Sequence, residues 1–185
     1  MRVTGGRLGG RALVAPPDAR VRPTSDKVRQ AVFNILEHND FGMGFAIEGA
    51  RTADLFAGTG AMGIEALSRG GAFCAFIDDA AESRALIRQN VETLGLTGIT
   101  KIWRRDATAL GKATEPYDLV FLDPPYRKNL IAPALASLRA GEWLSPDALI
   151  VAEAALDDDR PSADGYTVLD ERTYGDTRVL FLRAG

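Results

Sequence analysis

The stretch Thr-Ala-Asp-Leu-Phe-Ala-Gly-Thr-Gly-Ala-Met-Gly, positions 52–63, decides the fold. Its first five residues form a largely apolar run typical of a buried strand, and the glycines that follow predict a tight turn. Positions 61–69 then have a helical pattern, which Gly70 and Gly71 end. A strand, a glycine turn and a helix in this order indicate an α/β sheet that binds its ligand at the carboxyl ends of the strands.

The rest of the chain continues this alternation. We predict further strands at 73–77, 99–103, 119–122 and 148–152, and helices at 79–94 and 129–138. Asp79, with Glu82 three residues later, has the capping-box pattern that begins a helix. Two β-rich runs at 166–173 and 177–182 flank a Tyr-Gly-Asp turn and predict an antiparallel hairpin. The fold class is therefore α/β, with a mostly parallel sheet and an antiparallel edge.

Residues 1–23 differ from the rest in being rich in glycine, proline and arginine. We predict two short strands at 2–4 and 11–14, joined by glycine turns, as a ribbon separate from the domain at 24–185. We expect this ribbon to be mobile and to contribute little to the core, because its composition offers little apolar surface. A helix should follow, with Thr24 or Ser25 as its cap and apolar residues from Val28 to Leu36 at helical spacing.

Charge is distributed unevenly along the chain. The whole sequence has a net charge of −3, but residues 1–38 contain seven basic and three acidic side chains, a net charge of +4. The remaining 147 residues contain 15 basic and 22 acidic side chains, a net charge of −7. A basic arm on an acidic body suggests a polyanionic partner, whereas a solvated glycine-rich tail explains the charge equally well.

Composition argues against several classes of protein. With 185 residues and 46% hydrophobic content, the chain is long enough for one folded domain without disulfide or metal support. Cys74 is the single cysteine and His38 the single histidine, which disfavours a disulfide framework, a zinc site or a Ser-His-Asp triad. The three aspartates at 157–159 are best explained as a solvated turn. There is no apolar run of membrane-spanning length and no signal-peptide pattern, so we expect a cytoplasmic protein without a bound metal.

The glycine turn also predicts a ligand. Gly58, Gly60 and Gly63 match the pattern of dinucleotide-binding loops, and Asp78 lies twenty residues after Gly58, at the spacing of a ribose-binding acid. Asp54, however, would repel the pyrophosphate of NAD, whereas it attracts the sulfonium and ammonium groups of S-adenosyl-L-methionine. We therefore favour S-adenosyl-L-methionine as the cofactor. The alternative is a tight turn without a ligand, in which Asp54 caps the helix.

Other residues at strand ends complete the expected cofactor site. Asp78 would accept hydrogen bonds from the ribose hydroxyls, because Asp79 serves as the helix cap. Asp106 ends the third strand, where it either accepts a hydrogen bond from the adenine amino group or caps a short helix at 107–110. The remaining residues that we expect to contact the cofactor are Phe56 and Asp123.

The sequence Phe-Leu-Asp-Pro-Pro-Tyr at 121–126 predicts a second ligand site. Each proline fixes its own backbone angle and restricts the residue before it, and neither has an N–H donor. The Asp123 carboxylate and the Pro124 carbonyl therefore form a stiff pair of acceptors for both hydrogens of an exocyclic amino group. Tyr126 can stack on the base that carries this group. Such a site suits methyl transfer to an amino nitrogen of a base, although an ordinary strand-end turn would also explain the segment.

Taken together, these segments resemble the bacterial RsmD family of class I S-adenosylmethionine-dependent methyltransferases, which methylate N2 of a guanine in 16S ribosomal RNA. The similarity extends over R-V-T-G-G-R-L-G-G-R-A-L at 2–13, R-P-T-S-D-K-V-R-Q-A-V-F-N-I-L at 22–36, D-L-F-A-G-T-G-A-M-G-I-E-A-L-S-R-G at 54–70, F-L-D-P-P-Y at 121–126 and Y-G-D-T-R at 174–178. One departure is Asp78, where the family usually has glutamate. The shorter side chain still reaches a ribose.

The resemblance has further implications for fold and partners. It implies a Rossmann-like seven-stranded sheet with the last two strands antiparallel, a target base turned out of its stack, and an N-terminal ribbon that helps to bind RNA. The partner would be 16S rRNA, within a 30S subunit or an assembly intermediate, and the protein a monomer without membrane contact. Arg127 and Lys128 would hold the phosphate of the target nucleotide, or else form a charged helix start. The residues that we expect to contact RNA are Arg2, Arg7, Arg11, Arg22, Arg29, Arg127 and Lys128.

Three other functions compete with this one. An adenine-N6 methyltransferase acting on DNA or RNA would use the same Asp-Pro-Pro-Tyr chemistry, so these residues do not identify the base. A protein-glutamine methyltransferase also acts on an amide nitrogen, but it usually has asparagine at the position of Asp123. A non-catalytic RNA-binding assembly factor with a methyltransferase fold is disfavoured by the intact Asp54, Gly58, Gly60 and Asp123.

Overall fold

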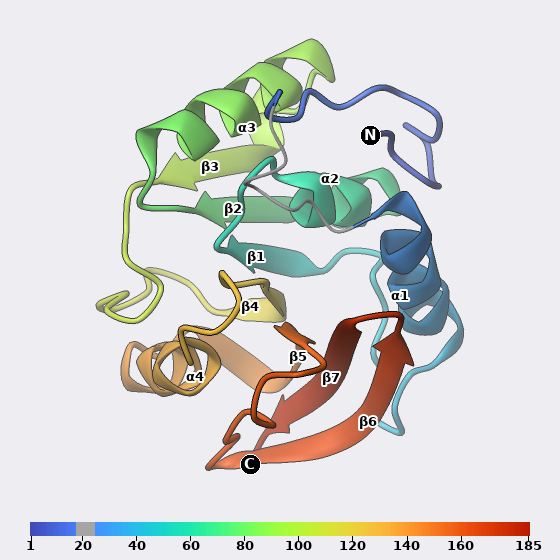
Figure 1. Cartoon of the computed structure of the whole chain (residues 1–185). Coiled ribbons are helices and arrows are strands. Elements are labelled where there is room, and N and C mark those ends of the chain that lie inside the picture. The colour runs from blue at the N-terminus through green and yellow to red at the C-terminus, as the bar shows by residue number, and fades with distance from the viewer. Residues whose placement is uncertain (18–24) are drawn as a thin grey trace.

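The computed structural model describes residues 1–17 and 25–185. Within these residues the chain forms a seven-stranded sheet with the strand order β3-β2-β1-β4-β5-β7-β6 (Figure 1). The strands are β1 (Arg51–Leu55), β2 (Phe73–Ile77), β3 (Thr100–Trp103), β4 (Tyr117–Leu122), β5 (Leu144–Ala155), β6 (Tyr166–Tyr174) and β7 (Thr177–Ala184). Strands β1 to β5 are parallel to one another, β7 is antiparallel to β5, and β6 is antiparallel to β7. The predicted α/β sheet with an antiparallel C-terminal hairpin is confirmed.

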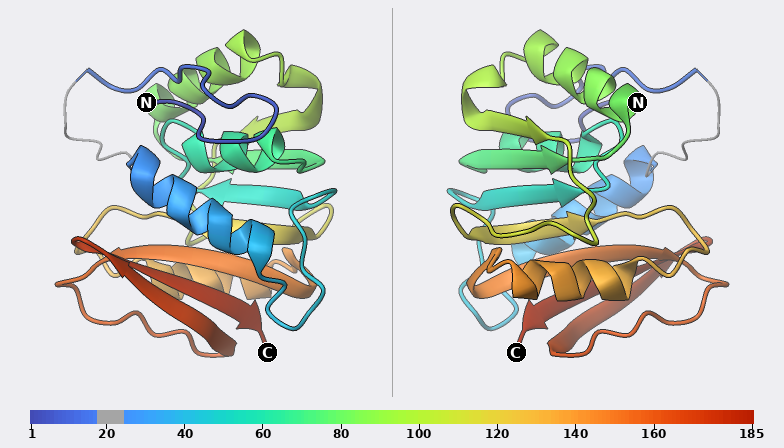
Figure 2. Two further views of the ribbon diagram at one scale, coloured as in Figure 1. Left: turned by 90° about the vertical axis from the view of Figure 1, so that its right-hand side faces the viewer. Right: turned by 90° about the vertical axis from the view of Figure 1, so that its left-hand side faces the viewer.

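Helices cover both faces of this sheet. They are α1 (Asp26–His38), α2 (Ala61–Ser68), α3 (Ala81–Thr93) and α4 (Ile131–Ala140), and a short 3-10 helix, η1 (Thr97–Ile99), precedes β3. α4 packs on one face and α1, α2 and α3 on the other, which the two side views show (Figure 2). Both faces of the central strands are therefore buried, as in other parallel sheets. No helix in the described part of the chain is long and apolar enough to cross a lipid bilayer.

Several element boundaries differ from the predicted ones. α3 begins at Ala81 and its N-cap residue is Ala80, which has no side chain that could cap it, so the capping box predicted at Asp79 is wrong. Asp78 instead accepts the backbone N–H of Ala80 at 2.9 Å and turns the chain toward the helix. Positions 107–110 form a turn and not a helix. β5 is longer than predicted because it pairs with β4 on one side and with β7 on the other.

The N-terminal arm, residues 1–17, packs against α2 and α3. Val3, Leu8 and Leu13 are only 2%, 7% and 6% exposed and belong to the apolar cluster that these helices form with the sheet. The expectation that the arm contributes little to the core is therefore wrong. Instead of two predicted strands, the arm contains a single bridge between Arg2 and Ala12. Three apolar residues spaced five apart attach the arm to the core. The glycine- and arginine-rich composition of the segment did not indicate this role.

A buried carboxylate holds the arm in place. Glu65 of α2 is fully buried and accepts the backbone N–H groups of Thr4 at 2.9 Å and Gly5 at 3.0 Å. It also forms ion pairs with Arg29 of α1 at 3.0 Å and with Arg69 at 2.9 Å. Because α2 directly follows the glycine turn, the arm, α1 and the predicted cofactor loop belong to one packed unit.

Candidate active site

The turn between β1 and α2 places backbone, and not side chains, at the carboxyl end of β1. Phe56, Gly58 and Gly60 have positive φ angles of 56°, 60° and 82°. Gly63, in the first turn of α2, lies over β2, where a Cβ would come within 2.5 Å of the Phe76 ring. Glycine at this position lets the helix pack closely on the strand, as in other nucleotide-binding turns. The local structure is therefore the one that the sequence predicts for a cofactor loop.

Asp54 lies beneath this turn and is only 2% exposed. Its Oδ2 accepts the backbone N–H of Gly63 at 3.0 Å, so the capping role that we considered as an alternative is present. Burial raises the pKa of Asp54 well above its ordinary value; the Gly63 hydrogen bond opposes this shift, and the charges of Asp123 and Asp78 add to it. We call these three aspartates, at the carboxyl ends of β1, β2 and β4, the acidic crevice. A cation bound there would relieve their repulsion and favour the ionised form of Asp54.

Asp78 holds the glycine turn from the end of β2. Its Oδ2 accepts the backbone N–H of Gly58 at 3.0 Å, and its Oδ1 accepts that of Ala80 at 2.9 Å. The prediction that Asp79 caps α3 is wrong: Asp79 is exposed, and Asp78 makes the hydrogen bond that precedes the helix. A carboxylate oxygen accepts more than one hydrogen bond, so these contacts remain compatible with ribose hydroxyls.

Asp106 and Phe56 lie at the borders of the expected cofactor site. Asp106 is exposed, and its Oδ1 accepts the hydroxyl and the backbone N–H of Thr108 at 2.7 and 2.8 Å. The hydroxyl and then the backbone hydrogen bond lower the pKa of Asp106. Asp106 thus caps the following turn, and the short helix that it was predicted to cap at 107–110 does not form. Phe56 is half-buried and packs against the apolar cluster between the sheet and α4.

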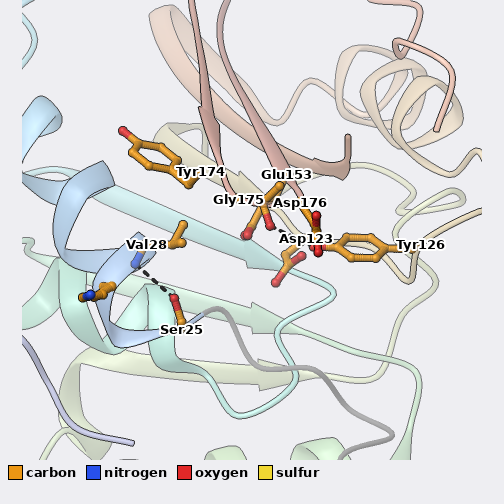
Figure 3. A pocket seen from close by; sticks show the side chains of 10 residues that line it. Ser25, Val28, Asp123, Tyr126, Glu153, Tyr174, Gly175 and Asp176 are labelled. Carbon is orange, nitrogen blue, oxygen red and sulfur yellow. Dashed lines mark hydrogen bonds between the residues drawn. The ribbon is translucent and has the colours of Figure 1, made fainter. Parts of the chain in front are cut away.

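A pocket of 480 Å³ opens where β4 and β5 end (Figure 3). Asp123 and Tyr126 of the second motif line it, and the Tyr126 hydroxyl lies 3.3 Å from Oγ1 of Thr177. Pro124, between them, is buried. Asp123 therefore lines this pocket and also lies at the same edge of the sheet as Asp54, which is opposite Phe121, two residues before Asp123, in the β1–β4 ladder. An amino group held at Asp123 would lie at the boundary between the pocket and the acidic crevice.

Segments that are far apart in the sequence meet at this pocket. α1 contributes Lys27 and Val28, its cap residue Ser25 also lines the pocket, and the β6–β7 turn contributes residues 174–177. These are parts of the R-P-T-S-D-K and Y-G-D-T-R segments on which the family resemblance rested. Sequence reasoning assigned only Asp123 and Tyr126 of the lining residues to a site; the buried carboxylate that it missed is Glu153 of β5. The available signal was a single carboxylate inside the apolar run at 148–155.

The residues expected to contact RNA differ in exposure within the described part of the chain. Arg2, Arg7 and Arg11 are exposed on the arm, where Arg2 donates a hydrogen bond to the Gly10 carbonyl at 2.7 Å. Lys128 is also exposed, after the second motif. Arg22, like Thr24, lies outside the described residues.

Arg29 and Arg127, which were also expected to contact RNA, lie in ion pairs. Arg29 is fully buried and pairs with Glu65 at 3.0 Å and with Asp26 at 2.7 Å, so its assignment to RNA is corrected: it ties α1 to α2. Arg127 pairs with Asp157, and its backbone N–H donates to Asp158 at 2.9 Å. Asp157 and Asp158 therefore hold the loop of the second motif.

The strand order, the antiparallel last strands, the glycine turn after β1 and the Asp-Pro-Pro-Tyr segment after β4 define a class I methyltransferase. The family model described as Conserved hypothetical protein 95 matches residues 1–183. The chain therefore belongs to this family, the RsmD family that its motifs predicted.

Named relatives and a solved structure agree with this placement. A candidate rRNA methyltransferase of Bacillus subtilis, YlbH, is 36% identical over 188 residues, covering 99% of this chain and 98% of its own. The ribosomal RNA small subunit methyltransferase D of Escherichia coli K12 is 35% identical over 163 residues, covering 88% and 78%. The structure of the Escherichia coli candidate methyltransferase yhhF has a TM-score of 0.83 and 28% identity, covering 100% of this chain and 97% of its own.

Proposed function

We propose that this protein transfers a methyl group from S-adenosyl-L-methionine to the exocyclic N2 amino group of a guanine in 16S rRNA. The observation that carries the proposal is the position of Asp123. It lines the pocket beside Tyr126, and it lies two residues after Phe121, which is opposite the buried Asp54 in the β1–β4 ladder. In this proposal the Asp123 carboxylate lies between the base in the pocket and the cofactor beside Asp54, which is what transfer of a group from one to the other requires.

The acidic crevice fits S-adenosyl-L-methionine by charge. Asp54 would attract its ammonium and sulfonium groups, directly or through water, and Asp78 would accept hydrogen bonds from its ribose hydroxyls. When bound, the cofactor would supply an electrophilic methyl group: its S–CH3 bond would break as the N–CH3 bond forms, S-adenosyl-L-homocysteine would leave, and one amino proton would be released to water. A pyrophosphate would meet the charges of Asp54, Asp78 and Asp123 at the same place, and this supports the assignment over NAD.

The chain's own residues act mainly by positioning the base. The Asp123 carboxylate and the Pro124 carbonyl accept the two hydrogens of the amino group, which favours pyramidal geometry and aims the nitrogen lone pair at the crevice. Tyr126 stacks on the base, with its hydroxyl anchored at Thr177. Orientation and fixed charges of this kind account for large rate effects without a covalent intermediate.

The substrate proposal rests on the relatives and on charge. Relatives that are 28–35% identical are named ribosomal RNA small subunit methyltransferase D. Residues 1–23 are proposed as an RNA-binding appendage to the domain at 24–185, in which exposed Arg2, Arg7 and Arg11 contact phosphates. Lys128 would contact the target nucleotide. We further propose a monomeric, cytoplasmic enzyme that acts on a 30S subunit or an assembly intermediate.

Transfer of a tritiated methyl group tests the proposal. Naked 16S rRNA and 30S particles are incubated with labelled cofactor and protein, and the RNA is digested to nucleosides. We expect labelled N2-methylguanosine, and its absence from both substrates would contradict the proposal. Labelled N6-methyladenosine would support the adenine alternative, and RNA binding without any transfer would support the non-catalytic assembly factor.

A further inference from the structure

Glu153 is a carboxylate in an otherwise apolar part of β5. It is only 7% exposed, and its neighbours along the strand, Ala152 and Ala154, are buried as well. A charged side chain in such a place is costly unless the fold or a ligand gives it hydrogen-bond donors. Glu153 lines the pocket that holds Asp123 and Tyr126, so a ligand in that pocket can supply one.

The strand register places Glu153 beside Asp123. Leu122, the last residue of β4, pairs with Ala152 of β5 in the parallel ladder; Glu153 is the next residue on β5, and Asp123 directly follows the end of β4. Side chains at paired positions of neighbouring strands leave the sheet on the same side. Both carboxylates line the pocket together with Tyr126 and the exposed Asp176, and Figure 3 labels all four. The pocket therefore presents two neighbouring carboxylates to a stacked base.

Two adjacent acceptors match the hydrogen-bond donors of one nucleobase better than those of the others. Guanine has hydrogens on two neighbouring nitrogens, N1 and N2. Adenine and cytosine have an amino group next to a ring nitrogen that carries a lone pair and no hydrogen. With the amino hydrogens held by Asp123 and Pro124, a carboxylate at the neighbouring position suits N1–H of guanine and opposes the bare ring nitrogen of adenine.

We propose that Glu153 accepts the hydrogen bond from N1–H of the target guanine and thereby selects guanine over adenine. This inference rests on the proposed function. Glu153 is a specificity-determining residue in this account, because Asp123 and Pro124 hold the reacting nitrogen.

The base 2-aminopurine provides a direct test, because it has the N2 amino group but no hydrogen on N1. The labelled position of 16S rRNA is first located with the wild-type protein. Ligated 16S rRNA with guanosine or 2-aminopurine riboside at that position is then assembled into 30S particles, and kcat/KM is measured for each. We expect the wild-type protein to prefer guanine by at least about tenfold, the range of a good hydrogen bond to a base edge.

In Glu153→Gln, the side-chain amide can donate to the bare N1, so we expect the preference for guanine to fall by about tenfold or more. Loss of the O6 carbonyl in 2-aminopurine affects both proteins alike and cancels from the comparison. Glu142→Gln is the matched control, since it makes the same change at a carboxylate that is 70% exposed and does not line the pocket, and its preference should equal that of the wild type. Thermal melting and calorimetric cofactor affinity establish that each variant is folded.

The outcomes separate the two proposals. If the wild-type protein produces N2-methylguanosine but Glu153→Gln keeps the wild-type preference, the role of Glu153 is refuted and the proposed function stands. An equal loss of activity on both substrates would indicate a merely structural carboxylate and would refute the role in the same way. If the wild-type protein labels adenine or no base, both proposals fail together.

Discussion

Replacing Glu65 by alanine is expected to lower the free energy of unfolding by about 3–5 kcal/mol, because buried Arg29 keeps Asp26 but loses its fully buried carboxylate partner, and Arg69 loses Glu65 as well. Glu65 and Arg29 are both fully buried, and their side chains form an ion pair of 3.0 Å. The Glu65 carboxylate also accepts the backbone N–H groups of Thr4 and Gly5, and each lost bond adds about 1 kcal/mol or less. Domains of this kind are stable by about 5–15 kcal/mol, so the variant should still fold, with little stability to spare.

Urea denaturation followed by circular dichroism measures this effect. The control is Glu142→Ala, because Glu142 forms an ion pair with Lys112 at 3.1 Å in which both side chains are at least 70% exposed. Exposed pairs contribute about 0–1 kcal/mol, so the control should unfold at nearly the wild-type urea concentration. A loss in Glu65→Ala that is no larger than in the control would refute the reasoning, since it would mean that the arm and the buried network do not hold the fold together.

Three further predictions concern the acidic crevice, the pocket and the arm. Asp54→Asn should raise the melting temperature at neutral pH while weakening S-adenosyl-L-methionine binding in calorimetry, because the folded-state pKa of Asp54 is raised and its ionised form costs stability. The loss of stability caused by ionised Asp54 develops as pH rises from the unfolded-state pKa through the folded-state pKa, so the stability gained by Asp54→Asn should shrink at acid pH. An Asp54→Asn variant that is less stable than the wild type at pH 7 would contradict this prediction. Asp123→Ala should lower kcat for methyl transfer by about 100- to 1000-fold, and normal turnover by this variant would rule out the role of Asp123. Tyr126→Ala should weaken binding of the stacked base by about 1–3 kcal/mol, which methyl-transfer kinetics will show. Replacing Arg7 and Arg11 together should reduce the slope of log K for RNA against log salt by about 1.5 without changing the melting temperature, and an unchanged slope would remove both residues from the RNA surface.

The sequence alone predicted the local structure around both ligand sites. The turn at 58–60 and the strand end at Asp123 lie where their motifs place them, because glycine, proline and apolar alternation act on residues a few positions apart. The capping box predicted at Asp79 is wrong because the preceding carboxylate, Asp78, accepts the backbone N–H of Ala80 instead. The net charge also predicted a basic arm, but a count of charges does not distinguish a buried arginine from an exposed one.

Only the tertiary structure decided which of these residues act together. Arg29 is as basic as Arg7 in the sequence, yet it is buried because α1 crosses α2 at Glu65. The arm joins the core because Val3, Leu8 and Leu13 find an apolar surface that α2 and α3 provide. Glu153 enters the pocket because β5 pairs in register with β4, and pairing between strands depends on contacts over long sequence separations that no local pattern records.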